Sequence, residues 1–189
     1  MRRSLVATTA VAAIALAGCT NGGDSGTSSP TSGQSDAAAV AYMDKVCGAA
    51  SAFAKVDKTA PKLDVGDPAK LKAEMAAYMG QHADAFTKSS ADLKQVGPSP
   101  VAGGDEAVTK MSETFTALGT LFAEAKTKIE QADANDATGG LQAAGEAISK
   151  LSELADPLRD LKAVPELQKA AQSAQKCQEM QRLGVAPTG

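Results

Sequence analysis

Few side chains in this sequence could do chemistry. The 189 residues include three cysteines, one histidine and no tryptophan. Cys19, Cys47 and Cys177 are widely separated, so no two of them have the close spacing that thiol metal sites and redox motifs use. The only histidine, His82, follows two methionines at helical spacing. Which role each of these residues can have depends on the segment of the chain in which it lies.

The segment before Cys19 is typical of a secretory signal peptide. A basic start, Met1-Arg2-Arg3, is followed by an uncharged and mostly apolar stretch over 5–17 and then by Gly18-Cys19. The apolar stretch is shorter than the roughly 20 residues that a membrane-spanning helix needs. We therefore predict that residues 1–18 are a leader that is cleaved.

The sequence Leu16-Ala17-Gly18-Cys19 resembles the lipobox of bacterial lipoproteins, and the alanine-rich chain is similar in style to small envelope lipoproteins of actinomycetes. The lipobox resemblance covers residues 1–19 only. It implies that the Cys19 thiol is diacylated, that Cys19 becomes the mature N-terminus and that acyl chains such as palmitate hold the protein on the membrane. Thr20 stands where an aspartate would signal inner-membrane retention. We expect a lipid anchor at the extracytoplasmic face of the cell membrane.

The charge of the mature chain disfavours several partners. The 19 Lys and Arg of the full chain include Arg2 and Arg3 of the leader, which leaves 17 against 22 Asp and Glu, a net charge of −5. Nucleic acids and anionic bilayer surfaces require clustered positive charge, so no nucleic-acid partner is expected. Membrane attachment then depends on the acyl chains, and stable anchoring requires more than one.

Cys47 and Cys177 remain as an even pair once Cys19 is acylated, and an exported chain folds in an oxidising compartment. We interpret the two residues as a disulfide. The bond would close a loop of about 130 residues, for which the chain-entropy model gives a stabilisation of roughly 4–5 kcal/mol. The alternative is a thiol metal site or redox centre, which this wide spacing does not favour.

Composition divides the mature chain into a tether, one domain and a tail. Residues 19–35 consist of the lipidated cysteine and a stretch rich in Gly, Ser and Thr, which predicts a flexible tether. Residues 36–183 are rich in Ala, Leu, Glu, Lys and Gln and nowhere alternate as strands do. They predict an all-α fold, an antiparallel helical bundle of four to five helices whose first and last helices are joined by the disulfide. Residues 184–189 are predicted to be a disordered tail.

Apolar residues recur at spacings of three and four along each predicted helix. The clearest helix, 105–132, has the stripe Val108, Met111, Phe115, Leu118, Phe122, Ala125, Ile129 and Ala132. Asp67-Pro68 opens another as N-cap and first residue, with the stripe Leu71, Met75, Met79, His82, Phe86, Ser89, Leu93 and Val96. The first helix, 36–56, has Val40, Met43, Cys47, Ala50 and Ala54 on one face. A fourth begins near Leu141 and is interrupted at Pro157, and the last, from Pro165, has Leu167, Ala170, Ala174 and Cys177.

His82 shares a helical face with Met75 and Met79, and thioethers together with imidazole suit copper, especially the reduced ion. The same positions belong to the apolar stripe, where methionine is a common gap filler, so the pattern favours core packing and no metal ligand. The chain lacks the Cys-x-x-Cys-His motif that attaches a c-type haem, and a single histidine gives little basis for a b-type haem. The acidic segment 133–136 lacks the register of a calcium loop. No cofactor is expected.

No nucleophile elbow, Walker motif or dinucleotide glycine motif appears in the chain, so the sequence gives no support for catalysis. We expect a non-enzymatic helical binding or interaction module of the cell envelope, with an envelope protein as a partner. The alternative is a carrier or scavenger of a small apolar ligand, such as a lipid or haem, or of copper. An enclosed apolar cavity would favour the carrier, and an exposed apolar patch or groove the interaction module.

Overall fold

The computed structural model describes residues 32–56, 66–133 and 159–183, and the positions 139, 142, 144–146 and 149 between them. These residues are helical or in turns, and no strand occurs among them, which confirms the predicted all-α class. Within the described ranges, three long helices and three short ones have defined bounds: α1 (Ser32–Lys55), α2 (Pro68–Leu93), α3 (Gly104–Gln131), α5 (Arg159–Lys162), α6 (Pro165–Ser173) and α7 (Gln175–Arg182).

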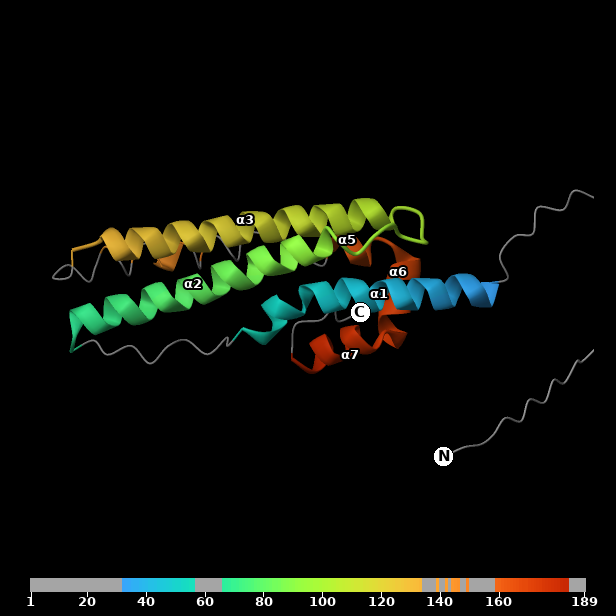
Figure 1. Ribbon diagram of the computed structural model, residues 1–189, viewed down its shortest axis with the longest axis horizontal. Helices are drawn as coiled ribbons and strands as arrows, with labels where there is room; N and C mark the ends of the chain where they lie inside the picture. Colours follow the sequence, from blue (N-terminus) through green and yellow to red (C-terminus); the bar gives the residue numbers. More distant parts are fainter. Residues whose placement is uncertain are drawn as a thin grey trace, which may run out of the picture.

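The three long helices lie side by side and alternate in direction (Figure 1). α2 packs against both α1 and α3, while α5 contacts α3. The last two helices, α6 and α7, both pack against α1. The end of the chain therefore returns to its first helix, which closes the antiparallel bundle as predicted.

Local sequence determines where α2 begins and where the α2–α3 hairpin turns. Asp67 Oδ1 accepts hydrogen bonds from the backbone N–H groups of Ala69, at 3.1 Å, and Lys70, at 3.0 Å. Pro68 occupies the first turn, where its missing N–H costs nothing. In the connection to α3, Gly97 and Gly103 have φ values of 86° and 76°, which favour glycine.

The predicted apolar stripes form the core. All of the α3 stripe from Val108 to Ile129 is buried, and on α2 every stripe residue but the half-buried His82 is buried. Four phenylalanines from three helices meet at the centre: Phe53 stacks on Phe86 with ring centroids 4.9 Å apart, and Phe86 lies 5.6 Å from both Phe115 and Phe122. This aromatic cluster joins α1, α2 and α3.

Away from the aromatic cluster, small and hydroxylated residues allow α2 and α3 to pack close together. A Cβ atom on Gly119 would lie 2.7 Å from Thr87 Oγ1, so only glycine allows the approach seen at this point. Further along, Ser90 Oγ lies 2.9 Å from the Ser112 carbonyl oxygen and 2.7 Å from Thr116 Oγ1. The buried hydroxyls are thus satisfied across the helix pair.

The structure differs from the predicted boundaries in two places. α1 begins at Ser32, about one turn before the predicted start, because adding a turn to a helix that has already formed costs little. The predicted last helix is divided at Ala174, whose extended backbone separates α6 from α7. The leader, residues 19–31 of the tether, the tail and most of the fourth helix with Pro157 lie outside the described residues.

Replacing Phe115 or Phe122 by alanine should lower the free energy of unfolding by roughly 3–5 kcal/mol, because each empties a buried aromatic site. Thermal and urea melts followed by circular dichroism measure the loss. Thr120→Ala, at an exposed position of the same helix, is the matched control and should change stability little. Losses below about half a kcal/mol at both phenylalanines would contradict the observed packing.

Candidate functional site

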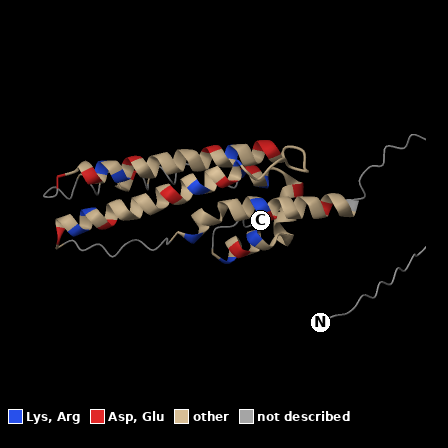
Figure 2. Ribbon diagram, viewed as in Figure 1, with Lys and Arg blue, Asp and Glu red and all other residues tan. Residues whose placement is uncertain are grey.

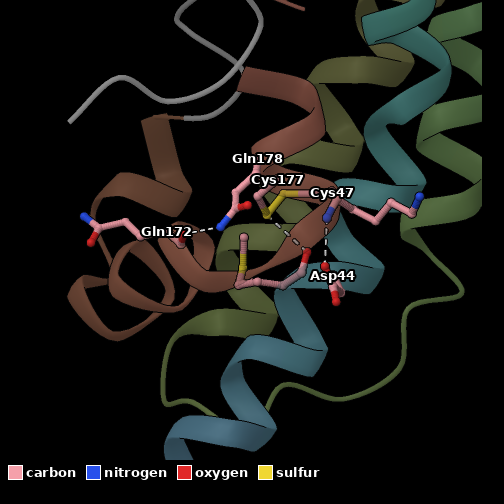
Figure 3. The surroundings of a disulfide bond; sticks show 7 residues. Asp44, Cys47, Gln172, Cys177 and Gln178 are labelled. Atoms are coloured by element: carbon pink, nitrogen blue, oxygen red, sulfur yellow. Dashed lines mark hydrogen bonds between the residues drawn. A yellow bond between two sulfur atoms is a disulfide. The ribbon is translucent and has the colours of Figure 1, made fainter. Parts of the chain in front are cut away.

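Cys47 of α1 and Cys177 of α7 form the predicted disulfide, with Cα atoms 5.0 Å apart (Figure 3). Both residues are buried, with 6% and 1% of their surface exposed. The bond joins positions 130 residues apart in the sequence. The structure therefore supports the interpretation of this pair as a structural crosslink in the interior of the bundle, and not as a thiol metal site or redox centre.

Polar contacts around the disulfide hold α7 in place. Asp44, on α1, accepts a hydrogen bond from the backbone N–H of Lys176 at 2.9 Å, which supplies a cap that α7 lacks from its own preceding residue. Gln178 donates to the Gln172 carbonyl oxygen at 2.9 Å and so ties α7 back to the end of α6. The break at Ala174 thus arises from tertiary contacts and not from a helix-breaking residue.

The candidate copper face belongs to the core. Met75 and Met79 are buried, and the half-buried ring of His82 stacks on Phe122 with centroids 5.1 Å apart. His82 Nδ1 lies 2.9 Å from the Tyr78 carbonyl oxygen, to which it donates. Among the described residues no group of three His, Cys, Asp or Glu side chains is placed to hold a metal ion. Cys19 and the acidic segment from 134 onward lie outside the described residues.

An apolar pocket lies beside the disulfide between α1, α3, α5, α6 and α7. Its walls include Met43, Met111, Leu161, Leu167 and Met180. Its volume is about 20 Å³, close to that of one water-sized probe and far below the several hundred Å³ of a typical ligand site. Neither a lipid nor a haem fits this space.

A larger cleft of about 470 Å³ lies at the end of the bundle where α2 turns into α3. Its walls come from α1, the end of α2, the connecting loop and the first turns of α3. The lining residues combine an apolar floor with hydroxyl and charged groups: Tyr42, Leu93, Lys94, Gly97, Pro98, Asp105, Val108, Thr109, Ser112 and Glu113. The acidic residues Asp105 and Glu106 lie in the first turn of α3 at this end, where the ribbon is red (Figure 2).

Tyr42 is the unusual residue of this cleft. Only 4% of its surface is exposed, and its Oη atom has no hydrogen-bond partner within the part of the chain that the structure describes. Burial and then the Asp105 carboxylate raise the pKa of the phenol, while the nearby Ser99 hydroxyl offsets part of this rise. Ser99 Oγ is itself bonded to both the N–H and the carbonyl oxygen of Val101. A buried hydroxyl without a partner is costly, so the position requires explanation.

Sequence reasoning did not single out Tyr42 or this cleft. Tyr42 adjoins the apolar stripe of α1, and nothing local distinguishes it from a core residue. The Gly and Pro residues of segment 97–104 are typical of a loop, but they do not reveal the groups that the loop brings together.

Comparison of the chain with protein-family models, curated proteins and solved structures finds no match. None of the helices searched within the described residues combines the length and apolarity that crossing a membrane requires.

Replacing both Cys47 and Cys177 by alanine should lower the free energy of unfolding by a few kcal/mol, less than the loop-entropy value if the denatured chain is compact. The helical circular-dichroism signal should persist, because the phenylalanine cluster does not involve either residue. The oxidised wild-type protein should show no thiol at these two positions by alkylation and mass spectrometry. Alkylation of either residue before reduction would contradict the bond.

Tyr42→Phe should raise the free energy of unfolding by about 1 kcal/mol, because it removes a buried hydroxyl that has no partner and keeps the ring. Urea melts of the wild type and the variant measure the difference. Tyr78→Phe, at the other tyrosine of the chain, is the control. A loss of stability of about 1 kcal/mol in Tyr42→Phe would instead reveal a hydrogen bond from Oη.

Proposed function

We propose that this protein is a lipid-anchored lipoprotein of the extracytoplasmic envelope whose helical bundle is a non-enzymatic binding module. The acylated residue is Cys19, and the tether that follows it separates the bundle from the membrane. Acyl chains provide the membrane attachment, and no nucleic acid is a partner. The cleft beside Tyr42 is the binding surface of the module.

The observation that carries the export part of this proposal is the buried disulfide. Disulfides persist in secreted and envelope proteins and are rare where thiols are kept reduced. Cys47 and Cys177 are bonded in the interior of the bundle, which leaves Cys19 as the third and last cysteine of the chain. The lipobox resemblance assigns that remaining thiol to acylation.

One observation supports a binding module over the alternative carrier, and a second concerns the kind of surface that the module offers. The apolar pocket beside the disulfide measures about 20 Å³, which is too small for a lipid or haem. Among the described residues Leu183 is the one large hydrophobic side chain that is exposed, so they form no extended apolar patch for docking a protein. The partly polar cleft of about 470 Å³ is the proposed surface, because the buried Tyr42 belongs to its wall.

Cys19→Ala should abolish incorporation of a fatty-acid analogue and move the protein out of the membrane fraction, because the lipobox offers no other acceptor thiol. Metabolic labelling followed by fractionation and immunoblotting measures both effects. Thr20→Ala, which keeps the thiol and changes the next residue, should behave as wild type. Wild-type labelling of Cys19→Ala would show that the anchor assignment is wrong.

A further inference from the structure

The C-terminal segment is interrupted at a residue where its sequence would continue as a helix. Residues 166–183 contain neither glycine nor proline, and alanine, which stands at position 174, has the highest helix propensity of all residues. The apolar stripe keeps its spacing of three and four across the break, at Leu167, Ala170, Ala174 and Cys177. Ala174 nevertheless has a φ of −74° and a ψ of 123°, an extended conformation that separates α6 from α7.

Two backbone groups that would bond each other in a continuous helix are bonded to side chains instead. In an α-helix the Lys176 N–H would donate to the Gln172 carbonyl oxygen, four residues earlier. In the structure the Lys176 N–H donates to Asp44 Oδ1 at 2.9 Å. The Gln172 carbonyl oxygen accepts from the Gln178 side chain, also at 2.9 Å (Figure 3). Both groups have a partner in either arrangement, so this pair does not oppose a change from one to the other.

The bend at Ala174 brings the two bonded cysteines together. α6 and α7 both pack against α1, and the chain changes direction between them (Figure 1). With α6 in place, a helical Ala174 would carry α7 away from α1 and Cys177 away from Cys47. The two cysteines, now 6% and 1% exposed, would then be open to solvent. The disulfide, whose Cα atoms lie 5.0 Å apart, therefore requires the bend.

We propose that Ala174 is a hinge controlled by oxidation of the two cysteines. In the dithiol protein residues 165–182 form one continuous helix, and the thiols of Cys47 and Cys177 are accessible. In the disulfide protein Ala174 is extended and α7 lies on α1. A newly made chain thus presents both thiols to an oxidant, and formation of the bond closes the domain. This inference goes beyond the proposed binding function and does not depend on it.

The bond forms by thiol–disulfide exchange with an external disulfide, which is the oxidant. The Cys177 thiolate attacks one sulfur of that disulfide, which forms a mixed disulfide and releases the first thiol of the oxidant. The Cys47 thiolate then attacks the Cys177 sulfur and releases the second. Two electrons pass from the cysteines to the oxidant, and the two cysteine protons end on its thiols. The first step requires an accessible thiol, which the open form provides.

The backbone conformation of Ala174 reports the position of the hinge. The NMR chemical shifts of its Cα and Cβ carbons distinguish an extended residue from a helical one. In the full chain, purified from membranes in detergent, these shifts should be extended when the protein is oxidised and helical after addition of a dithiol reductant. The Cys47→Ala, Cys177→Ala double variant should show the helical shifts without reductant. This variant decides the result if reduction unfolds the wild-type protein.

Gln175→Pro holds the hinge in its bent position. Residue 175 begins α7, where the missing N–H of a proline costs nothing, and proline favours an extended conformation at the preceding residue. In a continuous helix the same substitution would fall in the interior and would be strongly unfavourable. Alkylation of Cys47 and Cys177 in the reduced variant, followed by mass spectrometry, should therefore be at least about tenfold slower than in Gln175→Ala, the matched control.

The proposal is overturned if Ala174 remains extended in the folded protein without the disulfide, or if reduced Gln175→Pro and Gln175→Ala are alkylated at the same rate. A lower melting temperature of oxidised Gln175→Pro than of oxidised Gln175→Ala would also overturn it, because the bent form should accept the proline. None of these measurements involves Cys19 or the Tyr42 cleft, so failure of the hinge leaves the proposed function standing.

Discussion

The contact of α7 with α1 is the constraint on which the closed bundle depends. α2 and α3 form a hairpin through neighbouring sequence, but the C-terminal helices reach α1 only across the whole domain. The disulfide holds α7 against α1, and the Asp44 side chain of α1 accepts a hydrogen bond from a backbone N–H group in the first turn of α7. A helix of eight residues is not stable alone in water, so α7 exists because α1 holds it.

A second level of organisation comes from two unlike surfaces of the α2–α3 hairpin. One surface presents the phenylalanine cluster, which also engages Phe53 of α1 and sets the spacing of three helices. The other relies on Gly119 and on serine and threonine hydroxyls, which allow the backbones to approach closely. Ser89 of α2 also links this helix to α1, since its hydroxyl accepts a hydrogen bond from the Phe53 N–H at 3.2 Å.

Features encoded locally could be predicted from the sequence, and features made by distant groups could not. The stripe of α3 is visible because its period is that of a helix, and Asp67-Pro68 is a start signal that needs no partner. The Cys47–Cys177 pair followed from counting. The break at Ala174 depends on Asp44, which lies 130 positions earlier, and no rule of local propensity contains it. The isolation of Tyr42 Oη likewise results from how α1 meets the loop before α3.

The sequence separation of 130 between the two bonded cysteines also sets an order in time. A chain is made from its N-terminus at roughly 5–20 residues per second, so Cys177 follows Cys47 by on the order of ten seconds. During that interval the contacts of the α2–α3 hairpin, which close short loops, can form, while α1 lacks the helix that covers its cysteine. The disulfide can therefore form only after the last helix of the domain has been made. A truncated chain that lacks Cys177 would be left with a reactive thiol on α1.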